Sequence, residues 1–150
     1  MKEVAQLLNA MRGELVIMNY ALFGAVAQMR YTEPVATLDA DVLVVIPSAE
    51  RLESVRVGAW PVQFIPVFSP LTREALEQAD TAEFEGVPLR VVRADYLAVI
   101  ALSVGRAKDL ARILALLETG SVTLEGIEVL AQKHGLTDAW ARFKTRFLDD

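Results

Sequence analysis

The amino-acid sequence predicts one α/β domain, with a small mixed β-sheet followed by a helical C-terminal third. Short β-branched segments bounded by glycine and proline occur between residues 39 and 92, whereas helical periodicity dominates from residue 95 onward. With 150 residues, of which 53% are hydrophobic, the chain is long enough to bury a substantial core. We therefore expect a single domain over residues 1–150, with an α/β core over about 1–93 and a helical tail over about 94–150 packed on it.

The N-terminal segment is predicted to begin with a helix. Apolar residues recur at i, i+3, i+4 and i+7 over residues 4–11, which is the pattern of one helical face. The apolar stretch at 15–29 allows two interpretations. It forms a strand at 15–17 and a helix at 21–29, or it is one buried helix broken near Gly24.

The middle of the chain is predicted to be rich in strands. Alternating or β-branched runs between turn residues predict strands at 39–46, 54–57, 61–67 and 88–92. A short helix is expected at 72–79, with Thr72 as its N-cap.

The C-terminal third is predicted to be helical. Apolar periodicity predicts helices at 95–104, 108–118, 124–133 and 138–147. We expect Thr137 to cap the last of them and Gly135 to end the helix that carries His134, which gives His134 a structural role. The aromatic residues of the last helix share one stripe, which predicts core packing or a dimer contact: Trp140, Phe143 and Phe147.

Composition excludes several classes of function. The chain has no cysteine and a single histidine, which removes disulfides, thiolate zinc sites, cysteine nucleophiles and histidine-cluster metal sites. A formal charge of −5 gives no broad basic surface for nonspecific nucleic-acid binding. No apolar run reaches the roughly 20 residues that span a bilayer, and the N-terminus lacks a signal-peptide pattern. We therefore expect a cytoplasmic protein with no membrane partner.

The most informative pattern is the pair Asp39 and Asp41 at the start of an apolar strand. Alternate side chains of a strand share a face, and two carboxylates held that close repel each other unless a cation lies between them. Carboxylate oxygens suit Mg²⁺, and the small residues Gly24 and Ala25 allow backbone N–H groups to approach a phosphate. The alternative is that Asp39 and Asp41 cap a turn or solvate an edge strand.

Two segments of the chain resemble a known family. Residues 22–25 (Leu-Phe-Gly-Ala), a spacer of thirteen residues and residues 39–42 (Asp-Ala-Asp-Val) resemble the motif of the nucleotidyltransferase (DNA polymerase β-like) superfamily. Residues 96–113, with Gly105, Arg106, Lys108 and Asp109, are similar to the helix pair of its AbiEii-like bacterial branch. The two matches occur in the expected order, and the resemblance runs from residue 15 to about residue 117.

The resemblance implies a nucleotidyltransferase-type core that transfers NMP from an NTP substrate to a hydroxyl of an RNA or protein acceptor. It implies that Asp39 and Asp41 hold Mg²⁺ or Mn²⁺ as the catalytic metal ligands. Gly24 and Ala25 would bind phosphates. Relatives in toxin–antitoxin and phage-defence systems modify RNA or protein hydroxyls, so either acceptor is expected. A partner protein that supplies basic charge, or a homodimer, is the expected macromolecular partner.

The helix start at residues 105–109 has two interpretations. In the first, which the resemblance implies, Arg106 and Lys108 reach the triphosphate and Asp109 orients one of them through an ion pair. In the second, the segment only begins a helix, with Asp109 in its first turn and Arg106 in a surface salt bridge. The sequence favours neither interpretation over the other.

Three positions depart from the family pattern. Ala25 stands where glycine or serine is usual, and Ser103 stands where a lysine is expected. The third acid of the family falls at Gln63, whose neutral amide is neither a charged metal ligand nor a general base. The alternative to an active enzyme is therefore a catalytically impaired nucleotidyltransferase-fold domain that serves as a nucleotide-binding, regulatory or interaction module. A third possibility is an unrelated α/β domain.

Overall fold

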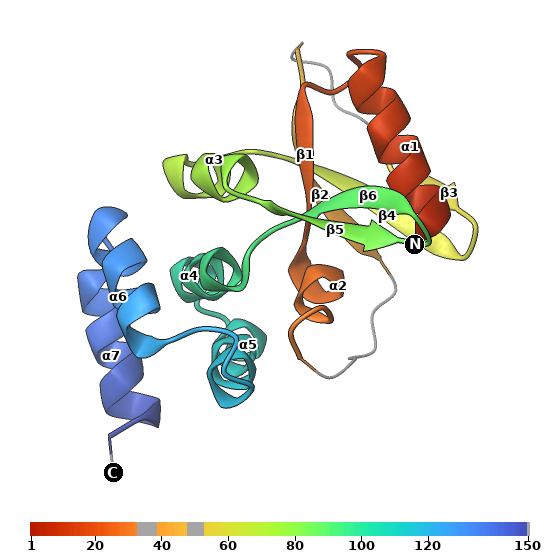
Figure 1. The fold of residues 1–150 in the computed structure, drawn as a ribbon. Helices are drawn as coiled ribbons and strands as arrows, with labels where there is room; N and C mark the ends of the chain where they lie inside the picture. Colours follow the sequence, from red (N-terminus) through yellow and green to blue (C-terminus); the bar gives the residue numbers. More distant parts are fainter. Residues whose placement is uncertain (33–38, 48–52, 150) are drawn as a thin grey trace. The chain divides into compact units, whose positions relative to one another are not determined.

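The computed structural model describes residues 1–32, 39–47 and 53–149, which form two compact units (Figure 1). The N-terminal unit is Met1–Arg93 and the C-terminal unit is Ala94–Asp150. The first contains a mixed sheet with helices and the second is helical, which confirms the α/β fold class predicted from the sequence.

The described residues of the N-terminal unit form one mixed sheet of six strands. Its order is β3-β4-β2-β1-β6-β5. The strands are β1 Asn19–Phe23, β2 Ala40–Val45, β3 Val55–Val57, β4 Trp60–Pro66, β5 Asp80–Phe84 and β6 Val87–Val91. The central strand β1 pairs antiparallel with β2 and parallel with β6, while β2 pairs parallel with β4. The outer pairs, β3 with β4 and β5 with β6, are antiparallel hairpins.

Three helices pack on this sheet: α1 Lys2–Gly13, α2 Gly24–Gln28 and α3 Pro70–Glu77. Helix α1 contacts β1 and β6, whereas α2 and α3 both contact β1 and β2. The buried face of α1 consists of Val4, Ala5 and Leu8, as its periodicity predicts. The central strands are therefore covered by helices, and the buried middle of β2 (Val42 to Val44) lies at the core.

A polar network centred on Tyr20 joins the helices to the sheet. The Tyr20 hydroxyl donates to Asn9 Oδ1 (2.7 Å) and accepts from the Arg90 backbone N–H (3.2 Å). The Arg90 guanidinium donates to the carbonyls of Tyr20 (3.1 Å) and Leu76 (2.7 Å). Burial raises the pKa of Tyr20 and lowers that of Arg90 from their usual values. Side chains and backbone of α1, β1, β6 and α3 are thus held by one connected set of hydrogen bonds.

The C-terminal unit consists of four helices in its described residues. They are α4 Ala94–Val104, α5 Ala107–Glu118, α6 Leu124–Lys133 and α7 Thr137–Phe147. Helix α4 contacts the other three and is buried almost all round, as expected for a helix that is apolar on every face. On α7, Trp140 stacks on Phe143 with ring centroids 5.4 Å apart, and Phe143 lies 5.0 Å from Phe147. Both Trp140 and Phe143 are buried, so the aromatic stripe serves core packing.

Both interpretations of residues 15–29 are wrong in detail. Residues 15–17 form no strand, because the backbone N–H groups of Val16 and Ile17 donate to the Met11 carbonyl and so close the end of α1. Leu15 takes a left-handed φ of 60° in this turn. The strand begins later, at Asn19, and runs to Phe23 because each of its residues pairs with β2. The helix therefore starts at Gly24.

Two predicted helix caps are also wrong. Helix α3 begins at Pro70 and Ser69 is its N-cap, with Thr72 at the third helical position. Ser69 Oγ accepts from the Thr72 N–H and Thr72 Oγ1 accepts from the Ser69 N–H, both at 3.1 Å, so the two form a reciprocal capping box. Thr137 is the first residue of α7 and makes no capping hydrogen bond.

Strand β5 has no counterpart in the prediction. Its residues are mostly exposed and polar (Asp-Thr-Ala-Glu-Phe), so the sequence lacks the alternation that marks a half-buried strand. The strand forms because it is the outer member of a hairpin with β6, closed by Glu85 and Gly86. None of the helices in the described part of the chain combines the length and apolar character that crossing a bilayer requires.

We expect Tyr20→Phe to lower the free energy of unfolding of the N-terminal unit by about 1–3 kcal/mol, because it leaves Asn9 and the Arg90 N–H without their buried partner. Urea unfolding followed by the fluorescence of Trp60, in β4, measures this. Tyr31→Phe is the matched control. It removes one hydroxyl hydrogen bond, to the Val92 carbonyl, and should cost less. Equal effects of the two substitutions would contradict a central role for the Tyr20 network.

Candidate functional site

The pairing of β1 with β2 places a carboxylate against a glycine turn. Phe23, the last residue of β1, is the register partner of Asp41, and the chain turns into α2 at the next residue, Gly24. Gly24 has a φ of +67°, and a Cβ added to it would lie 2.8 Å from Asp41 Oδ2. The Asp41 side chain therefore occupies the space that any other residue at position 24 would fill. Glycine is required both by its backbone conformation and by this contact.

The neighbouring strand brings a third polar side chain to the same place. In the parallel pairing of β2 with β4, Gln63 is the register partner of Asp41, so both side chains project from the same face of the sheet. Gln63 Nε2 donates to Asp39 Oδ2 at 3.2 Å. Asp39 directly precedes β2 and lies two residues from Asp41, on the same face by strand alternation. The structure thus brings together Gly24, Asp39, Asp41 and Gln63.

Ala25 is the second residue of α2 and follows the glycine turn directly. Its side chain is partly buried, as are those of Asp39 and Asp41, whereas Gln63 is exposed. The first turn of α2 contains no acidic residue, and Phe23, its N-cap, makes no side-chain capping bond. Gly24 and Ala25 thus lie at the turn into α2, and their binding of phosphate stays a prediction.

The donor set fits one divalent cation. Mg²⁺ is usually bound through one or two carboxylates and completes its octahedral shell with water and substrate phosphate oxygens, which Asp39 and Asp41 allow. Within residues 1–32, 39–47 and 53–149, no group of three or more acidic or histidine side chains is placed to hold a metal. Gln63 therefore takes the position beside Asp39 and Asp41 that the family resemblance assigns to a third acid, and it contributes a neutral amide there.

Arg106 and Lys108 belong to the other unit, at the start of α5, and both are exposed. Arg106 Nε contacts Asp109 Oδ2 at 2.7 Å, and the Arg106 backbone N–H donates to the same oxygen at 3.2 Å. Arg112 lies 3.6 Å from Asp109 Oδ1. The ion pair between Arg106 and Asp109 belongs to both interpretations of residues 105–109, and Asp109 lies in the first turn of α5.

Asp109 is the buried centre of this group, with only 2% of its surface exposed. Burial alone would raise the pKa of the Asp109 carboxyl. The hydrogen bonds from Arg106 and the positive charges of Arg106 and Arg112 outweigh this effect, so the pKa lies below its usual value. Ser103, at the position where the family carries a lysine, donates from its hydroxyl to the Ile100 carbonyl at 2.6 Å.

The contact between Gly24 and Asp41 is the part of the site that sequence reasoning missed. The sequence assigned Gly24 to phosphate binding and Asp41 to metal binding as separate tasks. The available signal was the position of the glycine directly after an apolar strand, where a left-handed turn is common. The hydrogen bond from Gln63 to Asp39 was also not foreseen, although Gln63 itself was singled out.

We expect Gly24→Ala to lower the free energy of unfolding by about 1–3 kcal/mol, because alanine is strained at a left-handed φ and its Cβ would collide with Asp41. In an Asp41→Ala background the collision disappears, so the same substitution should cost measurably less. Thermal and urea unfolding of the four proteins gives this coupling. Gly13→Ala is the control, since nothing lies within 4 Å of the position that its Cβ would take. Equal costs in both backgrounds would contradict the contact.

We expect Asp109→Asn to destabilise the C-terminal unit in a pH-dependent manner. The pKa of Asp109 is lower in the folded protein than in the unfolded chain, so its charge adds stability above pH about 4, and this contribution is lost as the pH falls through the folded pKa. The difference in unfolding free energy between wild type and Asp109→Asn should therefore be present at pH 7 and shrink below pH about 4. A difference that stays constant with pH would contradict the ion pair.

Comparison with known proteins relates the fold to one solved structure. No protein-family model matches the chain, and no curated protein matches it by sequence. Among solved structures it is similar to an antigenic nucleotidyltransferase-like protein from Paracoccidioides brasiliensis, with a TM-score of 0.53, 12% identity and coverage of 93% of this chain and 92% of that one. Two structures of the antibiotic-resistance factor ANT(2'')-Ia resemble it less. A solution structure has a TM-score of 0.48 and 16% identity, covering 98% and 95% of the two chains. A crystal structure of its complex with adenylyl-2''-tobramycin has a TM-score of 0.42 and 12% identity, covering 96% of this chain and 98% of that one. The first of these similarities shows that the chain has the fold of that nucleotidyltransferase-like protein.

Proposed function

We propose that this protein transfers a nucleotidyl group from an NTP to a hydroxyl acceptor, with Asp39 and Asp41 as ligands of a divalent cation, Mg²⁺ or Mn²⁺. The single observation that carries the proposal is the Asp41 carboxylate lying against the Gly24 turn, with Asp39 on the same face of the sheet. This arrangement offers carboxylate oxygens for a metal and backbone N–H groups for the phosphates it accompanies. The nucleotidyltransferase fold supports the same chemistry.

Each group of the site has a distinct role in this reaction. Asp39 and Asp41 would hold the cation, and the backbone of Gly24 and Ala25 would bind phosphate oxygens. When bound, the cation supplies positive charge that offsets the charge of the triphosphate. The acceptor oxygen forms a bond to the α-phosphorus, the bond from that phosphorus to the bridging oxygen breaks, pyrophosphate leaves and the acceptor proton passes to solvent.

The acceptor is the hydroxyl of an RNA or a protein, as the resemblance to the AbiEii-like branch implies. The net charge of −5 favours a protein acceptor, or an RNA presented by a basic partner, because no broad basic surface accompanies the site. The proposal also includes a toxin–antitoxin-like role and a partner protein or homodimer. It includes a cytoplasmic location as well, because NTPs are abundant there. The family resemblance also assigns Arg106 and Lys108 to the triphosphate, and in the structure Arg106 forms an ion pair with Asp109.

One observation favours a second function, that of a nucleotide-binding or regulatory module without turnover. Gln63 donates a hydrogen bond to Asp39 in the place where a third acid would complete the catalytic set. Two-metal phosphoryl transfer uses such an acid to position the second ion and the attacking oxygen, and an amide cannot replace its charge. In this case the protein would bind metal and NTP through Asp39 and Asp41 but would not transfer NMP.

Label transfer from each α-labelled NTP, with Mg²⁺ or Mn²⁺ and cell extract as the source of acceptor, tests the enzyme. We expect transfer by the wild type and a loss of about a hundredfold or more in Asp39→Asn and Asp41→Asn, because several kcal/mol of transition-state stabilisation depend on the metal ligands. Asp80→Asn is the matched control, an exposed carboxylate in β5 of the same sheet, and should leave transfer unchanged.

Gln63→Glu separates the two functions. If the wild type shows only a thermal shift with metal and NTP, and Gln63→Glu gains transfer, the protein is a binding module whose missing charge is at position 63. If the wild type already transfers label, it is an enzyme that works without this acid. If neither metal nor NTP has an effect that depends on Asp39 and Asp41, both functions are refuted.

A further inference from the structure

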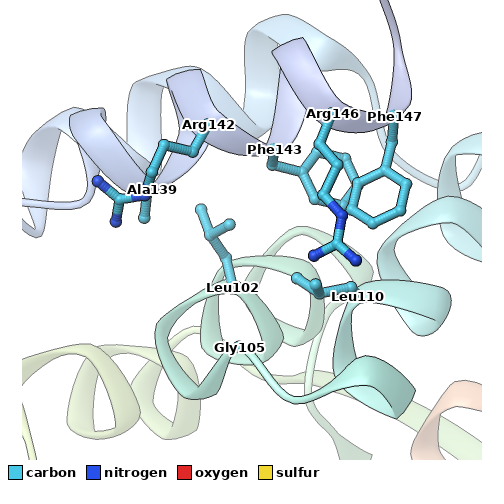
Figure 2. A pocket seen from close by; sticks show the side chains of 8 residues that line it. All are labelled: Leu102, Gly105, Leu110, Ala139, Arg142, Phe143, Arg146 and Phe147. Carbon is cyan, nitrogen blue, oxygen red and sulfur yellow. The ribbon is translucent and has the colours of Figure 1, made fainter.

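The C-terminal unit contains a cavity of about 300 Å³ between α4, α5 and α7 (Figure 2). Its lining belongs entirely to this unit: Leu102, Gly105, Leu110, Ala139, Arg142, Phe143, Arg146 and Phe147. An apolar cavity of about 150 Å³ holds a benzene molecule, so this one has room for a ring or a hydrocarbon chain together with a small polar group. Its volume lies at the lower end of the range for ligand pockets.

The lining combines two kinds of surface. Leu102, Leu110 and Phe143 present apolar side chains from three helices, and Phe143 is backed by the buried ring of Trp140. Arg142 and Arg146 are four residues apart on α7, so their side chains lie on one face of that helix. Figure 2 shows the Arg146 side chain directed toward Leu110, whereas the Arg142 side chain extends past Ala139. No acidic residue lines the cavity.

The two guanidinium groups have free hydrogen-bonding capacity. Within the part of the chain that the structure describes, neither Arg142 nor Arg146 forms an ion pair. Arg146 instead packs over the Phe147 ring, with its Cζ 4.8 Å from the ring centroid. Because a guanidinium binds carboxylate and phosphate oxygens through paired N–H groups, two such groups beside an apolar cavity suit an oxyanion attached to an apolar body.

We propose that this cavity is a binding site for a small amphipathic anion, a carboxylate or monophosphate carried on a hydrocarbon or aromatic body. The apolar part lies against Leu102, Leu110 and Phe143. The oxyanion is held by Arg146 and, once its side chain turns toward the cavity, by Arg142. The net charge of −5 repels anions from the molecule as a whole, so binding depends on this local pair of positive charges. The site is independent of the proposed nucleotidyl transfer and uses none of its residues.

Trp140 provides a direct readout, because it adjoins Ala139 and stacks on Phe143. The chain has two tryptophans, so Trp60→Phe leaves Trp140 as the only one. We expect octanoate to change the Trp140 fluorescence with saturation in this protein. Octylammonium, which has the same apolar body and the opposite charge, and acetate, which has the charge without the body, should bind about tenfold more weakly or worse.

Matched variants locate the binding. The double substitution Arg142→Gln with Arg146→Gln should weaken octanoate binding by about tenfold or more, because both charge-assisted hydrogen bonds are removed. Ala139→Phe should also abolish binding by filling the cavity. Lys144→Gln is the control on the same helix, since Lys144 lies over the Trp140 ring (5.7 Å) and does not line the cavity.

Circular dichroism and the thermal midpoint of each variant establish that it is folded before titration. Equal affinity for octanoate and octylammonium would overturn the proposal, as would unchanged octanoate binding in the folded double-arginine variant. Loss of binding in Lys144→Gln to the same extent as in the double variant would also overturn it. Absence of any saturable octanoate effect in the Trp60→Phe protein, together with absence of binding of phenyl phosphate, would show that the cavity takes no such ligand.

Discussion

The antiparallel pairing of β1 with β2 is the constraint on which the candidate site depends. It sets Phe23 opposite Asp41, so the residue that follows the strand must turn beside a carboxylate. Only a residue without a side chain fits there, which explains Gly24 and the start of α2 directly after it. The parallel pairing of β2 with β4 then aligns Gln63 with the same acid. Two strand registers thus determine the positions of Gly24, Asp41 and Gln63.

The two units are stabilised in different ways. In the N-terminal unit a buried tyrosine and a partly buried arginine satisfy backbone groups from several elements, so that helices and sheet are held in a fixed register. In the C-terminal unit a helix that is apolar on all sides contacts three others, and a group of ion pairs surrounds Asp109 at the start of α5. Hydrogen bonds are directional and fix geometry, whereas apolar burial stabilises without specifying orientation as tightly.

Much of the fold and part of the site could be predicted from the sequence. The periodicity of the four C-terminal helices and the turn residues around β2, β4 and β6 were strong local signals. Gln63, which was singled out from the sequence, does lie beside Asp39. The failures have physical causes. Strand β5 is polar because it lies at an edge, and residues 15–17 close a helix through backbone bonds that no side-chain pattern reveals. The Gly24–Asp41 contact depends on strand register, which is tertiary information.

The hydrogen bond between Gln63 and Asp39 has a consequence for how the protein behaves in the absence of metal. Three carboxylates held close together repel one another, and this repulsion lowers the stability of the metal-free protein. A cation that binds between them relieves the repulsion and so stabilises the fold. Because residue 63 is a glutamine, Asp39 accepts a hydrogen bond from its amide N–H group. The site therefore carries one negative charge fewer than a site with three carboxylates. The fold therefore needs no cation to relieve repulsion between Gln63 and Asp39.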